Sequence, residues 1–146
     1  MPITIARLAP ADHARWRRLA EGYNTFYGVE RPGAEYDFAW RRLLAGDGLH
    51  AFGAYADGVL VGITHYLFHA STWHPRVCYL QDLFVDPAAR GHGVARVLIE
   101  AVANDARDRD AARLYWHTQA DNVVARGLYD KVARYRGFIR YEIPLA

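Results

Sequence analysis

The chain has 146 residues, of which 52% are hydrophobic, and a formal net charge of +2. This length suits one packed domain, so we expect a single domain over residues 1–146. Acidic residues alternate with the arginines, which argues against a nucleic-acid-binding face, and no apolar run is long enough to span a membrane.

The number of cysteines and the pattern of the first residues indicate the cellular compartment of the protein. Cys78 is the one cysteine, which excludes an intramolecular disulfide and a cysteine-cluster metal site. The first residues alternate like a strand instead of forming the apolar core of a secretory signal. We therefore expect a cytoplasmic protein with no metal site.

Hydrophobic periodicity predicts strands and helices in mixed order. The predicted strands cover residues 3–7, 50–56, 59–68, 76–85, 112–118 and 138–143. The predicted helices cover residues 11–27, residues 34–45, a segment that begins at about Gly93, and residues 122–135 with Asp121 as the cap. This order predicts an α/β (α+β) fold: a mixed sheet with antiparallel early strands, a later parallel strand-helix-strand crossover, and helices on both faces.

A glycine-containing loop follows the fourth predicted strand. Asp86-Pro87 ends that strand, because proline has no N–H to donate, and Gly91 and Gly93 precede the amphipathic helix. Glycines allow the backbone close to a ligand, the first-turn N–H groups have no intrahelical partners, and Arg90 adds a full charge. Taken alone, the loop is as consistent with a simple turn as with a phosphate cradle.

Two other phosphate-binding motifs do not fit this loop. A Rossmann fingerprint requires a third glycine where Arg96 stands, and a Walker loop requires a Gly-Lys pair, whereas the one lysine of the chain is Lys131. Nucleoside triphosphate chemistry is therefore not expected.

Two motifs in order carry a resemblance to a known family. Arg90-Gly91-His92-Gly93-Val94-Ala95 resembles the pyrophosphate loop of the GNAT superfamily of acyl-CoA-dependent N-acetyltransferases. The segment from Asn122 through Ala125 and Leu128 to Tyr129 resembles the Asn-x-x-Ala-x-x-Leu-Tyr helix of that family. Gly137-Phe138 lies further from Tyr129 than in many members, which predicts a longer helix or an extra turn.

The resemblance implies acetyl-CoA as the acyl donor and assigns residues to its binding. In the family, strand backbone binds the pantetheine arm, the glycine loop binds the pyrophosphate, and the Asn helix completes the site. The implied donor-binding residues are Leu83, Phe84, Val85, Arg90, Gly91, His92, Gly93, Val94, Ala95, Arg96, Asn122, Ala125 and Tyr129. From their residue types alone, Asn122 is also consistent with a helix cap and Leu83 to Val85 with ordinary core.

Acid and base roles fall on two further residues. Tyr129 is the candidate general acid, since a phenol with a pKa of about 10 holds its proton at neutral pH and can give it to a thiolate. Asp82 is the candidate group that attracts the acceptor ammonium or relays its proton through water; a salt bridge to an arginine such as Arg76 is the alternative. Gln81 and Asp82 form a polar doublet in an apolar strand, which predicts a β-bulge.

The acceptor is less well defined. Tyr79 to Val85 resembles the polyamine and diamine acetyltransferase branch, with Gln81 at a position that is often Glu, so the expected acceptor is a diamine, polyamine or amino-acid-like amine. Candidate walls of its pocket are Tyr23, Tyr27, Glu30, Glu35 and Tyr36. The evidence for a metal site at His65, His69 and His74 is weak, and we expect these histidines to line the pocket or the surface, where one of them could act as a base. Cys78 is expected to be a small core residue.

The sequence therefore predicts an enzyme in which a small-molecule amine attacks acetyl-CoA directly. A protein lysine or N-terminal acetyltransferase and a non-catalytic acyl-CoA-binding module are the alternatives. The resemblance also implies a homodimer.

Overall fold

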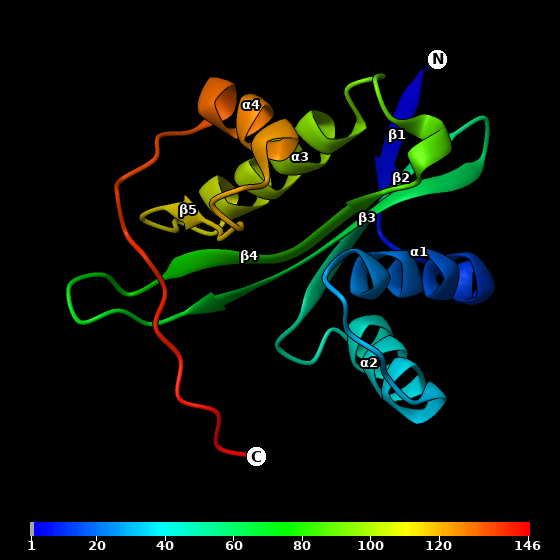
Figure 1. Cartoon of the computed structure of the whole chain (residues 1–146), viewed down its shortest axis with the longest axis horizontal. Helices are drawn as coiled ribbons and strands as arrows, with labels where there is room; N and C mark the ends of the chain where they lie inside the picture. The colour runs from blue at the N-terminus through cyan, green and yellow to red at the C-terminus, as the bar shows by residue number, and fades with distance from the viewer. Residues whose placement is uncertain (1) are drawn as a thin grey trace.

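The computed structural model describes residues 2–146 and shows a five-stranded sheet between two layers of helices (Figure 1). The strands are β1 (Ile3–Ala6), β2 (His50–Ala56), β3 (Val59–His69), β4 (Val77–Val85) and β5 (Leu114–Tyr115). The helices are α1 (His13–Phe26), α2 (Gly33–Ala45), α3 (Val94–Asp108) and α4 (Val123–Val132), with single 3₁₀ turns at Pro10–Asp12 and Pro87–Ala89. The strands lie in chain order, all neighbours antiparallel except the parallel pair β4 and β5, which confirms the predicted fold class.

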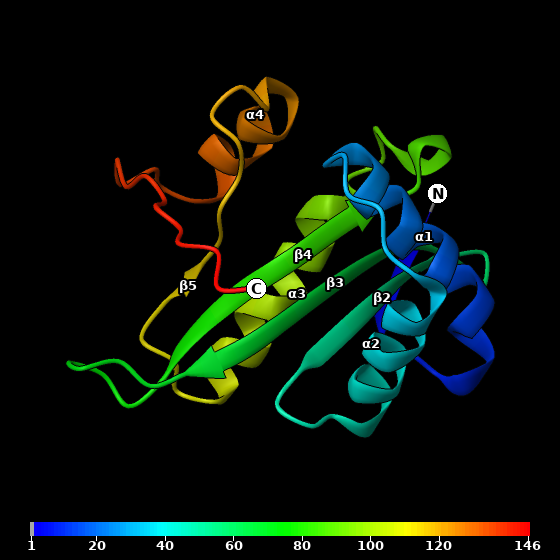
Figure 2. The same ribbon diagram turned by 60° about the horizontal axis from the view of Figure 1, so that its bottom comes forward.

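Apolar side chains on both faces of the sheet hold the helices. On one face Trp16 and Leu19 of α1 and Trp40 of α2 are buried against Ile63 of β3. On the other face α3 packs across the sheet, and α4 lies beside it, as Figures 1 and 2 show. The predicted coverage of both faces is therefore confirmed.

A β-bulge interrupts the pairing of β3 and β4 at the predicted polar doublet. Tyr66 pairs with Leu80 and His65 pairs with Asp82, so Gln81 is the extra residue. Simple alternation would place Asp82 on the same face as Leu80, which packs with α3. The bulge moves Asp82 to the opposite face, where α1 lies.

Strands β4 and β5 are paired over a short length only. Their register joins Cys78 to Leu114 and Tyr79 to Tyr115, and β4 then continues to Val85 while the chain after β5 turns away toward α4 (Figure 2). In the described part of the chain, the edge of β4 from Leu80 onward has no strand beside it on the β5 side. Its unpaired backbone groups are available to a ligand.

The C-terminal third differs most from the prediction. The predicted strand over residues 112–118 is reduced to Leu114–Tyr115, and the predicted helix over 122–135 ends at Val132. Asn122 occupies the cap position that was assigned to Asp121. The predicted strand over residues 138–143 is wrong: residues 133–146 have no regular structure and cross past the ends of β3 and β4 without pairing with them (Figure 1). A strand needs a neighbouring ladder, and apolar alternation by itself does not supply one.

None of the helices in residues 2–146 combines the length and the apolar character that a membrane crossing requires.

Candidate active site

The glycine loop connects β4 to α3 in the form that an anion requires. Gly91 and Gly93 have φ values of +85° and +76°, and a Cβ atom at either position would meet no other atom within 4 Å. The space above these glycines is therefore open to a ligand. Gly93 is also the N-cap of α3, so the first-turn amides of the helix begin directly after it.

Other residues of this loop divide between structural and exposed positions. Val94 is buried against Gly62 of β3, where a Cβ would come within 2.9 Å of the Val94 side chain. Ala95 packs partly into the same core, and Arg96 is exposed and pairs with Glu100 over 3.3 Å. The Val94 side chain therefore anchors the start of α3 to the sheet, which leaves only its backbone on the side of the loop.

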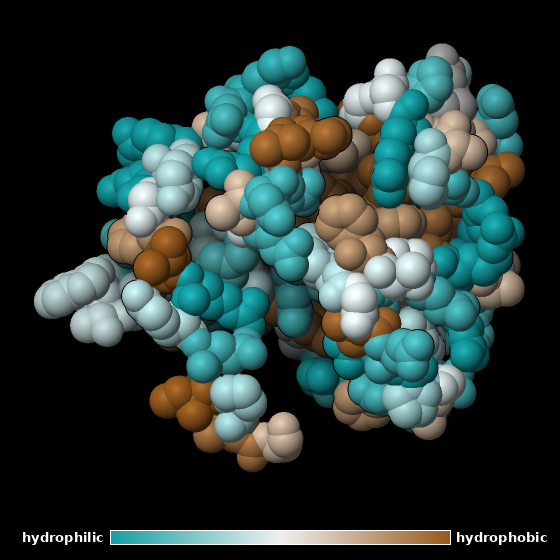
Figure 3. Space-filling model, in the orientation of Figure 1, coloured by the Kyte–Doolittle hydropathy of each residue, from teal (hydrophilic) through white to brown (hydrophobic). Residues whose placement is uncertain are grey.

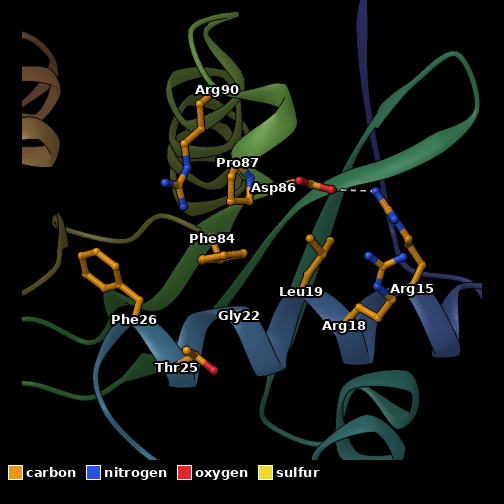
Figure 4. A pocket seen from close by; sticks show the side chains of 10 residues that line it. All are labelled: Arg15, Arg18, Leu19, Gly22, Thr25, Phe26, Phe84, Asp86, Pro87 and Arg90. Atoms are coloured by element: carbon orange, nitrogen blue, oxygen red, sulfur yellow. Dashed lines mark hydrogen bonds and ion pairs between the residues drawn. The ribbon is translucent and has the colours of Figure 1, made fainter.

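A pocket of about 430 Å³ lies between α1 and the end of β4 (Figure 4). The Arg90 side chain reaches into it: its guanidinium lies 5.5 Å from the centre of the Phe84 ring, and Nε donates to the Val85 carbonyl over 3.2 Å. Gly22 allows α1 to approach this ring, because a Cβ at Gly22 would lie 2.7 Å from Phe84. The pocket is thus lined by the Phe84 ring and by the positive charge of Arg90.

Asp82 is held from β3 on the α1 side of the sheet. His65 Nδ1 lies 2.9 Å from Asp82 Oδ2, and the Thr64 hydroxyl donates to the Asp82 carbonyl over 2.8 Å. The alternative ion pair with Arg76 is wrong, since the Arg76 guanidinium donates to the Arg109 carbonyl instead. The bulge explains the difference, because it turns Asp82 toward the face on which His65 lies.

The charge of Asp82 acts on three tyrosines of the site. Burial raises the pKa of Tyr23 well above its usual range, and the interaction of its hydroxyl with Asp82 raises it further. Burial also raises the pKa values of Tyr27 and Tyr79, with a further contribution from the negative charge of Asp82 at each. These phenols therefore stay protonated at neutral pH and line the surroundings of Asp82 without adding charge.

The helix α4 places Tyr129 across the same region. The Tyr129 ring packs edge-on against Trp116 with ring centres 5.4 Å apart, and burial raises its pKa, with Tyr27 as the second cause. The charge of Asp82 contributes to the raised pKa of Tyr27, and Tyr27 in turn contributes to the raised pKa of Tyr129. Tyr129 itself packs beside the core cluster that contains Cys78 and Leu80 of β4. A phenol with a raised pKa holds its proton until a strong base forms beside it.

Asn122 begins α4 without capping it. Its side chain makes no cap hydrogen bond, and its Nδ2 donates to the Thr118 hydroxyl over 3.1 Å. Thr118 also interacts with Tyr27, which lowers the pKa of that tyrosine. Asn122 therefore occupies the cap position, but its side chain binds Thr118 instead of capping the helix, and Ala125 lies in the first turn of α4.

Other candidate residues have structural contacts that account for them. Tyr36 is buried and bonded to Asn24, while Glu35 pairs with Arg31 at the surface. His69 bonds to Tyr115 over 2.8 Å. Cys78 is fully buried, and burial raises its pKa to about 12, as expected for a core thiol. Within residues 2–146, no group of three His, Cys, Asp or Glu side chains is placed to hold a metal ion.

Trp16 is a site residue that the sequence did not reveal. Its indole N–H donates to His65 Nε2 over 3.0 Å, although its spacing along α1 marks only a buried apolar position. The sequence predicts His65 only as one of three histidines at the pocket or surface, any of which could act as a base. The pairing of His65 with Asp82 depends on the register of β3 and β4, which no local pattern displays.

Comparisons with known proteins agree with this geometry. Residues 16–134 match the model of the Acetyltransferase (GNAT) family. The chain is 33% identical over 136 residues to the D-amino-acid N-acetyltransferase HPA3 of Saccharomyces cerevisiae, covering 90% of this chain and 84% of that protein. It is 32% identical over 92 residues to the thialysine N-epsilon-acetyltransferase of Caenorhabditis elegans, covering 63% of this chain and 58% of that protein.

Solved structures show the same fold. The ribosomal-protein-alanine N-acetyltransferase from Brucella melitensis biovar Abortus 2308 superposes with a TM-score of 0.83 at 26% identity, over 99% of this chain and 100% of that one. The aminoglycoside N-acetyltransferase AAC(6')-Iy in complex with CoA superposes with a TM-score of 0.86 at 20% identity, over 99% of this chain and 96% of that one. The family match spans most of the chain and includes the glycine loop and the α4 motif. The chain thus belongs to the GNAT acetyltransferase family and is an acetyl-CoA-dependent N-acetyltransferase.

Proposed function

We propose that the protein acetylates a primary amine of a small molecule, with Asp82 receiving the acceptor and Tyr129 protonating the leaving thiol. The observation that carries this proposal is the position of Asp82 at the β-bulge. The bulge turns the carboxylate to the α1 face, close to where β4 loses its β5 partner, and Tyr129 of α4 packs beside Cys78 and Leu80 of the same strand. We therefore place the base and the acid beside the part of β4 that has no β5 partner.

The residues around this part of β4 suit the acyl donor. We assign the pantetheine arm to the edge of β4 at Leu83, Phe84 and Val85, where no β5 residue pairs and where Arg90 binds the Val85 carbonyl, with Asn122 and Ala125 on the opposite side. The pyrophosphate falls to the open backbone of the glycine loop, from Arg90 through Gly91, His92 and Gly93 to the first turn at Val94, Ala95 and Arg96. When bound there, acetyl-CoA supplies the activated acetyl group.

The side chains then divide the proton transfers between them. Asp82 attracts the ammonium and takes one proton from it, directly or through water, which frees the nitrogen lone pair for attack on the thioester carbon. The N–C bond forms and the C–S bond breaks; Tyr129 gives its proton to sulfur and regains one from the new amide nitrogen. Because two protein groups supply base and acid, we propose that no metal takes part, and turnover should be unchanged by a chelator.

The surroundings of Asp82 favour an acceptor with few charges. Gln81 is neutral, and the neighbouring side chains of Tyr23, Tyr27 and Tyr79 are neutral phenols. The relatives named for D-amino acids and thialysine act on amino-acid-like amines. We therefore propose an amino-acid-like amine or a diamine as the acceptor, in preference to a polycationic polyamine.

A thiol-release assay tests this function. Acetyl-CoA is incubated with the protein and with D- and L-amino acids, thialysine, diamines, polyamines or lysine-containing peptides, and free CoA is followed with a thiol reagent. We expect release that depends on a small amine. Release with peptides alone would assign the enzyme to protein acetylation, and tight CoA binding without any acceptor-dependent release would identify a binding module.

We also propose that the enzyme is a homodimer joined through its C-terminal segment. Large apolar side chains of this segment are between 64% and 94% exposed: Tyr135, Phe138, Ile139, Tyr141, Ile143 and Leu145. Figure 3 shows the segment projecting from the body with apolar residues at its end. A second copy would bury them, and light scattering of the full chain should give twice the monomer mass; a monomeric mass would contradict this assembly.

A single domain and a cytoplasmic location complete the proposal. Cys78 is buried and has no second cysteine to pair with, which suits a reducing compartment. Limited proteolysis should leave one resistant core that contains the family match over residues 16–134. Fractionation of cells should recover the activity with the cytoplasm.

A further inference from the structure

A buried hydrogen-bond chain connects helix α1 to the Asp82 carboxylate. The Trp16 indole N–H donates to His65 Nε2 over 3.0 Å, and His65 Nδ1 lies 2.9 Å from Asp82 Oδ2. Trp16 is 1% exposed and His65 is 9% exposed, whereas 27% of the Asp82 side chain reaches solvent. The chain thus runs from the core to the edge of the site.

Trp16 determines which nitrogen of His65 carries the proton. An indole N–H can only donate, so Nε2 must be the acceptor. The proton of the neutral ring is then on Nδ1, which donates it to Asp82 Oδ2. Both ring nitrogens are satisfied in this tautomer, and in the other tautomer two donors would face each other between Trp16 and His65.

A neutral imidazole orients a carboxylate without competing for its charge. An arginine in the same place would offer Asp82 a full positive charge and would exclude the acceptor ammonium. His65 is the one basic side chain paired with Asp82 within residues 2–146. The other titratable groups that respond to Asp82 are Tyr23 and Tyr27 from α1 and Tyr79 from β4.

We propose that His65, held in one tautomer by Trp16, positions Asp82 so that Oδ2 stays bound to His65 and Oδ1 receives the acceptor ammonium. The backbone supports this arrangement, because Thr64 binds the Asp82 carbonyl next to the bulge. His65 and Trp16 are positioning residues, since they act through Asp82 and do not touch the substrate. This inference rests on the acceptor role of Asp82 in the proposed function.

Two substitutions of His65 separate positioning from packing. In His65→Asn the amide nitrogen takes the place of Nδ1 and can still donate to Asp82, whereas in His65→Gln the polar end takes the place of Nε2 and keeps only the contact with Trp16. We expect kcat to fall about tenfold in His65→Gln and less than about threefold in His65→Asn, with the KM for acetyl-CoA unchanged in both. Equal losses in the two variants would overturn the inference, as would full turnover in His65→Gln.

A double-mutant cycle tests whether His65 acts through Asp82. If it does, His65→Gln costs nothing further in the Asp82→Asn background, because the group that it positions is already gone. Independent losses in the double variant would show a separate role for His65. Melting temperatures of all four proteins report whether each remains folded.

Nitrogen NMR of His65 tests the tautomer without using activity. With uniformly ¹⁵N-labelled protein, we expect a protonated Nδ1 and an unprotonated Nε2 in the wild type, and a mixture of the two tautomers in Trp16→Phe. A protonated Nε2 in the wild type would overturn the inference even if acetyl transfer is confirmed. Conversely, if the expected tautomer is observed but no thiol is released in response to an amine, the positioning of Asp82 by His65 stands and the proposed function is contradicted.

Discussion

The Tyr79 ring stacks on the Tyr115 ring with centres 5.0 Å apart, at the last residue pair that joins β4 to β5. Beyond this pair β4 continues alone on that side, first through the bulge at Gln81 and then along Asp82 to Val85. The stacked pair therefore marks the closed end of the gap in which we place the thioester. Aromatic stacking at this point supports a very short parallel pairing that has few backbone hydrogen bonds of its own.

Removal of the Tyr129 hydroxyl should affect chemistry without affecting donor binding. We expect kcat of Tyr129→Phe to fall about 100-fold, because the general acid is lost while the ring still packs against Trp116. Steady-state kinetics with acetyl-CoA varied should show an unchanged KM. Tyr55→Phe is the matched control, since Tyr55 lies on β2 and its hydroxyl donates to Asp12. Wild-type turnover in Tyr129→Phe would remove this residue from the acid role.

A pair of glycine substitutions tests the anion cradle. Gly93 and Gly28 both have positive φ values, +76° and +68°, and a Cβ would meet no atom within 4 Å at either place. Alanine should therefore cost about 1 kcal/mol of stability at each, from the left-handed backbone alone. Only Gly93→Ala should also raise the KM for acetyl-CoA, by about tenfold, because its methyl group would occupy the space for the pyrophosphate. Similar KM values in the two variants would contradict the assignment of the loop.

Deletion of Gln81 tests the function of the bulge. The bulge lies between two residue pairs, Tyr66 with Leu80 and His65 with Asp82. Deletion of Gln81 therefore leaves a regular ladder in which all remaining side chains keep their present faces. We expect a folded protein whose kcat is reduced about 100-fold, since the local geometry of β4 beside the reacting atoms is lost. Gln81→Ala keeps the bulge and is the control. Circular dichroism checks the fold of both, and equal activity of the deletion and the wild type would show that the bulge is not needed.

Acid sensitivity of the fold should depend on Asp105, on the α3 side of the sheet. Burial acts to raise the pKa of Asp105, but hydrogen bonds from Tyr66 over 2.6 Å and from Arg109 over 3.2 Å outweigh it and hold the pKa below its ordinary value of 3.8. A depressed folded pKa contributes stability that is present above the unfolded value and is lost as the pH falls through the folded value.

The measurement is urea unfolding of the wild type and Tyr66→Phe between about pH 6 and pH 2. Near neutral pH the variant should be less stable by about 2 kcal/mol, because a hydrogen bond to a charged carboxylate is lost. The difference should shrink below about pH 4, as Asp105 becomes protonated in both proteins. Parallel stability curves for the two proteins would contradict the role of this pair.

The local backbone features of the proposed donor site could be predicted from the chain itself. Gly91 and Gly93, the stop at Asp86-Pro87 and the polar doublet at Gln81 and Asp82 each act within a few residues of their own position. Proline ends a ladder, glycine permits positive φ, and an extra polar residue distorts a strand whatever lies elsewhere in the fold. The mixed sheet and the helix layers on both of its faces followed from the same local periods.

Contacts between distant segments were decided only in the tertiary structure. The chain could not show that Asp82 binds His65 instead of Arg76, nor that Trp16 donates to the same histidine 49 positions away, because both depend on the register of β3, β4 and α1. Residues 138–143 have the alternation of a strand but pair with no neighbouring strand, and β5 ends at Tyr115 because the chain leaves the edge of β4 there. The sequence by itself thus determined the glycine loop, the bulge and the layered fold. Tertiary packing decided the hydrogen-bond partner of Asp82 and the irregular conformation of the C-terminal segment, because each hydrogen bond needs a partner that is close in space.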